Sequence, residues 1–490
     1  MSNITKQIVG GMKWTGLSTV IITVVQLLQF AILARLLAPS DFGLMSMIMV
    51  VIVLSQVFVD MGISSAIIHK QNITRNELSS LYWLNLLVGL LVFGIVLSLT
   101  PVIASFFNEP RLKELLVYVS FIFLIIPIGQ QFQFLMQKEL KFNELAKIEI
   151  VSVVSGSFSS IALAFFGYGV LSLIWGQIIT SAIKSLYLAF IGWKQWRPSF
   201  HFRKSDLEGF IDFGLYQMGS RIVQYIASNI DYMLIGRYLG KEALGVYSLA
   251  YQLITIPVTK INPIITKVAF PVFSLNQDDN KVLSKGFLDM TKMLAVVTFP
   301  ILVGLIAIAD ILVPVVFGEK WNNSIFVIQI LSVLGILRVL MNPNGSVLLA
   351  KGKANLIFIW DLFVALINGG AIWFVVSKGI EAVAIVYVLV SMINFILGRK
   401  LLEYVIELRA REYLSVLVRP ALISVLMGGA VILFVQAVTA LQIPYNVLML
   451  SLGVAVGVVV YIIMFYLLDK DYLKQMIGIF IRKKRRREAV

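Results

Sequence analysis

Residues 31–48 read AILARLLAPSDFGLMSMI, and residues 233–250 read MLIGRYLGKEALGVYSLA. The second stretch begins 202 positions after the first. Aligned without a gap, the two are identical at four positions: Arg35 with Arg237, Leu37 with Leu239, Gly43 with Gly245 and Ser46 with Ser248. In each copy an apolar run gives way to a short polar turn and then resumes. This weak similarity predicts an internal repeat.

The composition indicates whether the chain is surrounded by water or by lipid. Of 490 residues, 59% are hydrophobic and 14% are charged, and the mean hydropathy is +0.91. Soluble domains carry about 25% charged residues. So many apolar side chains require lipid as the solvent, and the sequence predicts an all-α polytopic membrane protein. Cysteine is absent, which excludes disulfides and thiol chemistry.

Charges, Gly and Pro divide the chain into apolar runs long enough to cross a ~30 Å hydrocarbon layer as helices. The first run is too long for a signal peptide and is interpreted as a span. We expect about fourteen transmembrane helices, at residues 14–37, 42–66, 78–106, 115–136, 146–166, 170–191, 209–236, 243–266, 287–317, 324–349, 355–376, 380–398, 414–436 and 446–468.

Lys and Arg indicate the orientation of these spans. With a cytoplasmic N-terminus, they are about fourfold more frequent in the inside segments than in the outside loops. Both termini are therefore predicted to be cytoplasmic. The net charge of +15 is explained by topology and does not call for nucleic-acid binding. The basic tail 482–487 could bind anionic lipid headgroups, but a plain cytoplasmic anchor is the favoured interpretation.

The two copies of the repeat end spans one and seven, so both run through the membrane in the same direction. This arrangement is typical of transporters built from parallel repeats. We expect two pseudo-symmetric six-helix lobes around a central cavity, residues 1–200 and 201–410, followed by two additional helices and the tail at 411–490. Each lobe opens with a helix that carries a polar stripe on one face. These stripes are Thr19, Thr23, Gln26 and Gln29 in the first lobe, and Arg221, Gln224, Ser228 and Asp231 in the second.

Polar groups cannot be satisfied by lipid, so the stripes should line the cavity. Charged residues inside the spans are also costly, which makes each a functional candidate. Lys260 lies between Pro257 and Pro263, which should kink or break the span. It is the first candidate for contacting a ligand; an ion pair with Asp231 or Asp361 is equally plausible.

Arg221 and Arg338 follow Lys260 as cavity cations suited to a phosphate. Arg338 could instead cap carbonyl groups freed near Pro343. Three carboxylates, Asp231, Asp361 and Glu149, could bind a coupling proton or sodium ion, or could pair with the basic residues. The cluster Gln130, Gln131, Gln133 and Gln137 could hydrogen-bond sugar hydroxyls, although for at least half of these glutamines a role in joining helices is favoured. Asp60 and Lys184 are further charges within or near the spans.

Catalytic motifs are missing from the sequence. His69 and His201 lie in loops without metal-ligand spacing, and there is no P-loop, nucleophile elbow or acidic metal motif. The outside loops are too short to house a sugar-transferring site. We therefore expect no enzyme activity, no metal and no cofactor.

Several longer blocks resemble a known family. They are LYWLN (81–85), IPIGQQFQFLMQKELKFNELAKIE (126–149), KINPIITKVAFPVFSLNQDD (260–279), VPVVFGEKWNNSI (313–325) and VLGILRVLMNPNGSVLLAKGKAN (333–355). The chain is similar, over residues 1 to about 410, to the colanic-acid and teichuronic-acid type of polysaccharide exporter. That group lies near the Wzx flippases in the multidrug/oligosaccharidyl-lipid/polysaccharide (MOP) flippase superfamily.

The resemblance implies a flippase of the bacterial inner membrane that moves an undecaprenyl-diphosphate-linked oligosaccharide by alternating access. It also implies that Arg221, Lys260 and Arg338 hold the diphosphate in a cationic lumen. Membrane lipids and other polysaccharide-assembly membrane proteins are the expected partners. Two alternatives stay open: a cation-coupled multidrug exporter of the same superfamily, and a membrane-embedded glycan polymerase or ligase.

Overall fold

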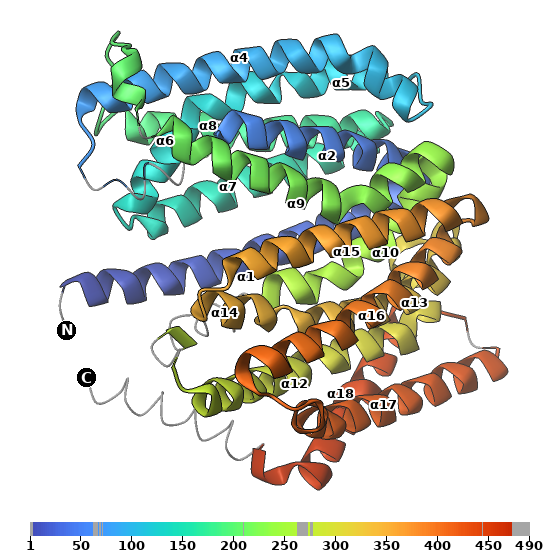
Figure 1. Ribbon diagram of the computed structural model, residues 1–490. Coiled ribbons are helices and arrows are strands. Elements are labelled where there is room, and N and C mark those ends of the chain that lie inside the picture. Colours follow the sequence, from blue (N-terminus) through green and yellow to red (C-terminus); the bar gives the residue numbers. More distant parts are fainter. Residues whose placement is uncertain are drawn as a thin grey trace. The chain divides into compact units, whose positions relative to one another are not determined.

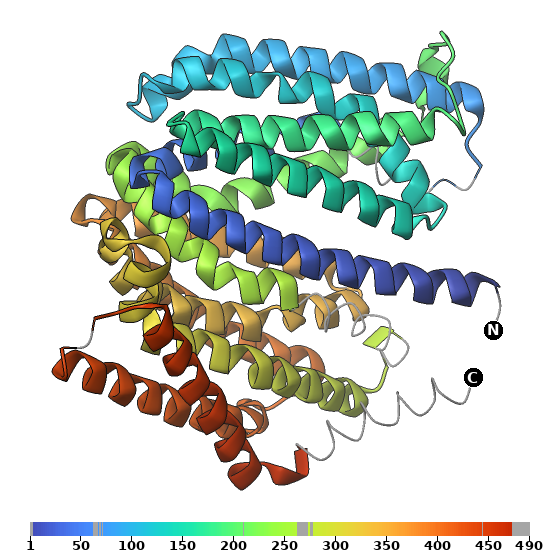
Figure 2. The same ribbon diagram turned by 180° about the vertical axis from the view of Figure 1, so that it is seen from behind.

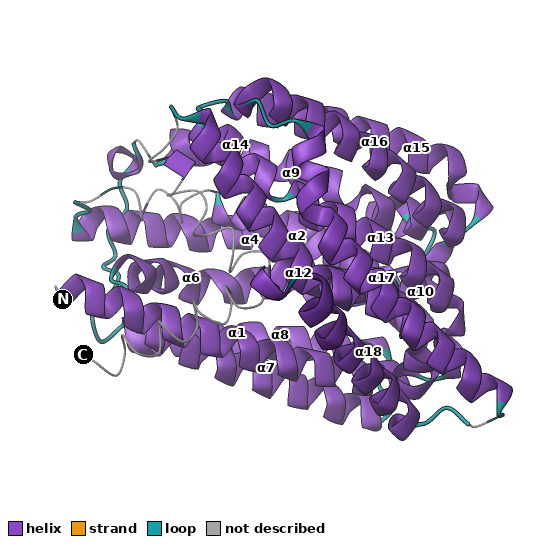
Figure 3. Cartoon of the chain, turned by 90° about the horizontal axis from the view of Figure 1, so that it is seen from below, coloured by secondary structure: helices purple, strands orange, loops and turns teal. Residues whose placement is uncertain are grey.

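The computed structural model describes residues 3–61, 67, 70, 72–208, 210–261, 273–274, 278–442 and 444–472. In these ranges the chain is helical, as Figure 3 shows, with no strand. The helices form two compact units, residues 1–248 and 249–490, so the boundary falls inside one helix. The predicted lobe boundaries at 200 and 410 remain predictions.

The first unit holds α1 to α10 (Figures 1 and 2). Its elements are α1 (Asn3–Leu36), α2 (Pro39–Asp60), α4 (Arg75–Phe106), α5 (Leu112–Ser120), α6 (Ile122–Lys138), α7 (Phe142–Phe165), α8 (Val170–Gly192), the 3-10 turn η1 (Lys204–Leu207), α9 (Ile211–Tyr238) and α10 (Gly240–Ile256), whose last turns belong to the second unit.

The second unit continues from the end of α10. Its elements are the π-helical turn η2 (Pro257–Ile261), α12 (Asn280–Leu312), η3 (Val313–Phe317), η4 (Glu319–Ser324), α13 (Ile325–Met341), α14 (Pro343–Ala350), α15 (Ala354–Val375), η5 (Val376–Lys378), α16 (Ile380–Ile406), α17 (Ala410–Ala440) and α18 (Val447–Leu468).

Twelve helices of the described chain are long and apolar enough to cross a membrane. They match twelve of the expected spans, which confirms an all-α polytopic fold. α9 and α10 stand where spans seven and eight are expected but are not among the twelve, so the count of fourteen stays a prediction. Large apolar side chains such as Phe158 and Phe374 are exposed on these helices, as a lipid-facing surface requires.

Two interruptions of helical geometry occur near polar positions. Pro257, which cannot donate to the preceding turn, begins the π-helical turn that contains Lys260, so a break at this point is confirmed. Pro263, like His69 and the basic tail, lies outside the described residues. The second interruption was not predicted: α9 is kinked at Asn229, whose φ is −127° and ψ is 15°.

The last two helices pack on α12 within the second unit. Asp469, at the end of α18, is buried and forms ion pairs with Lys292 of α12, at 2.8 Å, and with Arg419 of α17, at 3.2 Å. The Tyr461 hydroxyl of α18 donates to the Val296 carbonyl of α12 at 2.7 Å. α12, α17 and α18, together with the end of α10, also line an apolar cavity of about 550 Å³.

The repeated glycines of the two copies lie against each other inside the first unit. A Cβ on Gly43 of α2 would lie 1.7 Å from the carbonyl oxygen of Lys241 in α10. A Cβ on Gly245 of α10 would lie 1.8 Å from the carbonyl oxygen of Pro39 in α2. Lys241 follows Pro39 by the same 202 positions, so the contact is reciprocal, as a two-fold axis between the copies requires. Only glycine allows backbones to approach so closely.

We expect Gly43→Ala and Gly245→Ala each to destabilise the protein by about 1–3 kcal/mol, because the new methyl group would overlap a backbone carbonyl that cannot move alone. Gly94→Ala in α4 is the matched control, since a Cβ there has no neighbour within 4 Å. Thermal unfolding in detergent would measure the change. Equal stability of Gly43→Ala and Gly94→Ala would show that the contact is looser than described.

Candidate functional site

A polar cavity of about 780 Å³ lies within the first unit. Its walls come from α1, α2, α6, α7, α8 and α9. The volume falls in the range of about 300–1,000 Å³ typical of ligand sites. The polar side chains of this lining are Gln26, Gln56, Asp60, Gln130, Gln133, Gln137, Glu149, Ser152, Gln177, Thr180, Ser181, Lys184, Ser185 and Arg221.

Six glutamines dominate this lining. Gln130, Gln133 and Gln137 follow the spacing i, i+3, i+7 on α6, which places them on one face of that helix. Gln56 and Gln177 come from α2 and α8, so the amide groups reach the cavity from several sides. The fourth glutamine of the α6 cluster joins helices instead: Gln131 is buried and donates to the Leu78 carbonyl at 2.8 Å.

An ion pair stands at one wall of the cavity. Arg221 of α9 donates to Asp60 at 2.5 Å, and Gln130 approaches the other Asp60 oxygen at 3.4 Å. The Asp60 side chain is only 12% exposed, while that of Arg221 is 40% exposed. Asp60 ends α2, where the helix dipole disfavours a negative charge, and Arg221 compensates for it.

The charges of the lining cancel. Lys184 and Arg221 are cationic, and Asp60 and Glu149 are anionic. The formal charge of this cavity is therefore zero, and one of its two cations is already paired. Its walls offer mainly amide donors and acceptors, which match the hydroxyl groups of a neutral sugar better than a diphosphate. Gln130 Oε1 is buried and has no hydrogen-bond partner among the described residues.

The structure brings together six of the candidate residues that the sequence indicated in this unit: Gln26, Gln130, Gln133, Gln137, Glu149 and Arg221. Gln29 is turned to a neighbouring helix, where it accepts from the Ser157 hydroxyl at 2.7 Å. Asp231, at the position equivalent to Gln29 in the repeat, is fully buried and accepts from the Tyr247 hydroxyl at 2.8 Å.

The remaining predicted residues lie outside this lining. Gln224 is exposed on α9. In the second unit, Lys260 is half-buried in η2 and Asp361 is exposed on α15. The binding and coupling roles predicted for all these residues remain predictions.

Arg338 of the second unit is held by aromatic residues. It donates to the hydroxyls of Tyr251 and Tyr387, both at 2.6 Å, and its guanidinium lies 5.0 and 5.3 Å from the centres of their rings. These contacts hold the guanidinium in a defined place between two aromatic rings.

Gln56 and Gln177 of this cavity are not among the candidates that the sequence indicated, and Lys184 was named only as a charge within a span. A signal for two of them was present, because Gln177, Thr180, Ser181 and Lys184 follow the spacing i, i+3, i+4, i+7 in an otherwise apolar span. Gln56 lies four residues before Asp60 on α2, and only the fold places it beside the glutamines of α6.

Comparison with known proteins identifies the family. Residues 32–326 match the model of a family described as polysaccharide biosynthesis protein. The teichuronic acid biosynthesis protein TuaB of Bacillus subtilis is 44% identical over 96% of this chain and 97% of its own. The lipopolysaccharide biosynthesis protein WzxC of Escherichia coli is 36% identical over 83% of this chain and 85% of its own.

Solved structures agree on the fold. An inward closed conformation of the lipid II flippase MurJ has a TM-score of 0.75 at 16% identity and covers 95% of this chain and 100% of its own. An inward-facing multidrug resistance transporter of the MOP superfamily has a TM-score of 0.59 at 16% identity and covers 79% of this chain and 96% of its own. The chain is thus a multi-pass membrane protein with the fold of these transporters, and by sequence it belongs to the polysaccharide biosynthesis protein family.

Proposed function

We propose that this chain is a flippase that carries an undecaprenyl-diphosphate-linked oligosaccharide across the bacterial cytoplasmic membrane by alternating access. The observation that carries the proposal is the glutamine-lined, formally neutral cavity of the first unit. Its six amide side chains can donate to and accept from sugar hydroxyls at the same time. In this proposal the oligosaccharide occupies that cavity during transport.

The relatives support a glycan as the cargo. TuaB is named for teichuronic acid biosynthesis and WzxC for lipopolysaccharide biosynthesis. Both names refer to polymers that contain sugars, and both proteins match this chain over most of its length. The proposal takes the shared class of cargo from these names and leaves the particular glycan open.

The diphosphate and the lipid would be held differently from the sugars. Arg338, fixed by two tyrosines, and Lys260, on the π-helical turn, are the proposed diphosphate contacts in the second unit. Arg221 would have to release Asp60 before it could contact the diphosphate in the same way. The ~55-carbon tail would stay in the bilayer, because each methylene removed from an apolar environment costs about 0.8 kcal/mol.

The energy source in this proposal is an ion gradient, without a cofactor. Glu149 lines the cavity and is the first candidate for binding a proton or sodium ion. Asp231 and Asp361 are the other candidates. Neutralising a carboxylate in a membrane-embedded site changes its cost of burial, which is how ion binding could drive a change of state.

The multidrug exporter is the nearest alternative. It predicts an acidic, aromatic-lined cavity for cationic drugs, whereas the lining described above is neutral and contains one aromatic residue, Phe134. A glycan polymerase or ligase is the alternative from another class, and our proposal includes no enzymatic step. Three measurements in a deletion strain separate these proposals. Loss of a flippase should make lipid-linked oligosaccharide accumulate, loss of a drug exporter should lower drug efflux, and loss of a polymerase or ligase should change polymer length.

Replacing cavity glutamines should reduce export without unfolding the protein. We expect Gln133→Leu and Gln177→Leu each to lower surface-polysaccharide output about five- to tenfold, because each removes hydrogen bonds worth roughly 1 kcal/mol from the bound sugar. Gln436→Leu, which changes an exposed residue of α17 outside this lining, is the matched control and should have a smaller effect. Normal export by both cavity variants at normal protein levels would place the sugar elsewhere.

The Arg221–Asp60 pair allows binding and stability to be separated. Arg221→Gln alone should destabilise the protein, because it leaves a largely buried carboxylate without its cation, and the double variant Arg221→Gln/Asp60→Asn should recover stability. If Arg221 also contacts the diphosphate, export stays low in the double variant. Wild-type export by the double variant would limit Arg221 to its structural partner.

The proposed orientation, with both termini in the cytoplasm of the cell, can be checked directly because the chain has no cysteine. Lys113, at the start of α5, and Lys204, in η1, are exposed residues expected on opposite sides of the membrane. Lys113→Cys should react with an impermeant maleimide on intact cells. Lys204→Cys should react only after permeabilisation, and the reverse pattern would invert the topology.

A further inference from the structure

A second pocket lies within the first unit and shares no lining residue with the glutamine cavity. It has a volume of about 500 Å³ and is formed where α4 begins and the chain leaves α8. Its lining consists of Arg75, Asn76, Ser79, Trp193, Lys194, Gln195, Trp196, Arg197 and Ser199. None of the functions argued above uses this pocket.

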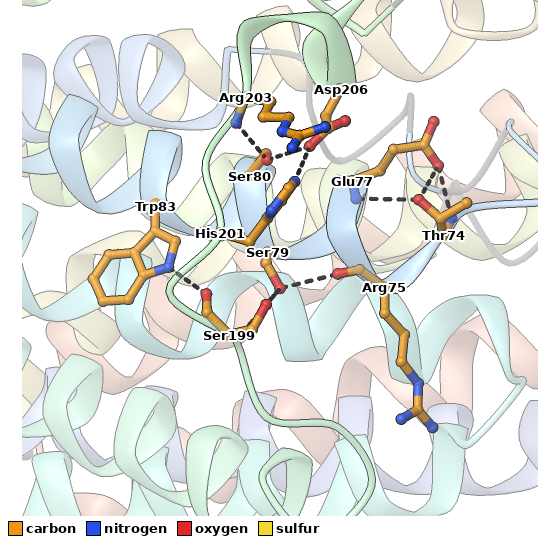
Figure 4. A network of polar contacts seen from close by, with 10 residues as sticks. All are labelled: Thr74, Arg75, Glu77, Ser79, Ser80, Trp83, Ser199, His201, Arg203 and Asp206. Atoms are coloured by element: carbon orange, nitrogen blue, oxygen red, sulfur yellow. Dashed lines mark hydrogen bonds and ion pairs between the residues drawn. The ribbon is translucent and has the colours of Figure 1, made fainter.

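The wall of the pocket is fixed by hydrogen bonds (Figure 4). The Ser79 hydroxyl of α4 accepts from both the backbone amide and the hydroxyl of Ser199, at 3.2 and 3.0 Å. It also donates to the Arg75 carbonyl at 2.9 Å. The Trp83 indole nitrogen donates to the Ser199 carbonyl at 2.8 Å. The segment after α8 is therefore held against the first turns of α4 before any ligand arrives.

A second set of bonds holds the same segment a few residues later (Figure 4). The buried Ser80 hydroxyl donates to Asp206 at 2.7 Å and accepts from the Arg203 amide at 3.1 Å. His201 Nε2 lies 2.9 Å from the same Asp206 oxygen. The Ser80 hydroxyl, with His201 and Arg203 nearby, lowers the pKa of the Asp206 carboxyl. Asp206 is therefore ionised at neutral pH and can accept these hydrogen bonds.

The charge of the pocket is of one sign. Arg75, Lys194 and Arg197 contribute three cations, and no carboxylate belongs to the lining. Arg197 is oriented by a bond from its Nε to the Trp193 carbonyl at 3.3 Å, and Lys194 lies 4.6 Å above the Phe190 ring. Guanidinium and ammonium groups placed in this way bind phosphate oxygens well.

Exposed aromatic residues belong to the same segment of the chain as two of these cations, Lys194 and Arg197. Trp193 is 49% exposed, Phe202 is 55% exposed and Phe200 is 97% exposed. The Phe200 ring stacks on Trp83 at 5.3 Å. Aromatic residues collect where a membrane protein meets the headgroup layer, and α4 and α8 are both candidate spans that end here. A soluble anion would need the cations but not this apolar rim.

We propose that this pocket binds the phosphodiester headgroup of an anionic membrane phospholipid. The three cations hold the phosphate, and the exposed rings lie among the glycerol and upper acyl region beside it. Basic pockets at the ends of transmembrane helices are known to take anionic headgroups in this manner. The proposal does not depend on the cargo of the flippase, because it rests on residues outside the glutamine cavity.

Native mass spectrometry of the full-length chain in detergent tests the pocket, with phosphatidylglycerol added back after delipidation. The variant Lys194→Gln/Arg197→Gln should retain at least about fivefold less phosphatidylglycerol than the wild type, because two headgroup contacts are lost. Glutamine keeps much of each aliphatic stem, so the fold should persist, which thermal unfolding without lipid would verify. Phosphatidylcholine should bind equally weakly to both proteins.

The matched control is Arg203→Gln/Lys204→Gln, which removes two charges from the same segment but outside the lining. It should retain phosphatidylglycerol like the wild type. Equal losses in the two double variants would show a general effect of charge and overturn the pocket. Stabilisation of the wild type by millimolar inorganic phosphate as large as that by phosphatidylglycerol would assign the site to a free anion and overturn the lipid.

Discussion

Hydrocarbon offers no hydrogen bonds, and the rest of this structure follows from that constraint. Backbone groups within the layer are satisfied by helices, while apolar side chains such as Phe158 face outward. Polar side chains must find partners or water inside the protein. Gln29 meets Ser157, Asp231 meets Tyr247, and six further glutamines line one cavity.

The same constraint separates two kinds of polar site. In the glutamine cavity the charges cancel, and the Arg221–Asp60 pair neutralises two of them directly. In the second unit Arg338 is held by two tyrosine hydroxyls and by the faces of their rings. A substrate with neutral sugars and a charged diphosphate has parts that suit both environments, and this correspondence underlies the proposed flippase activity.

Much of the fold could be predicted from the sequence, because apolar runs and the positions of Gly and Pro locate spans directly. The break at Pro257 is an example. The cavity was predicted only in part. Gln26 and Arg221 belong to polar stripes and could be selected, whereas Gln56 belongs to no such stripe and was not selected. The kink at Asn229 and the hydrogen bond from Gln131 to Leu78 depend on packing between helices. The periodicity of residues along one helix does not predict such packing.

The reciprocal contact between Gly43 and Gly245 has a consequence for the origin of the chain. Both copies present the same kind of surface near the start of a helix. In each copy, a backbone carbonyl meets the glycine of the other copy, and four residues later a glycine meets the other copy's carbonyl. Such a patch is self-complementary. Two separate half-length chains, each with a single copy of the stretch, could form the same contact as a symmetric dimer. Fusing them into one gene would then have freed the two copies to diverge, as the different partners of Gln29 and Asp231 illustrate.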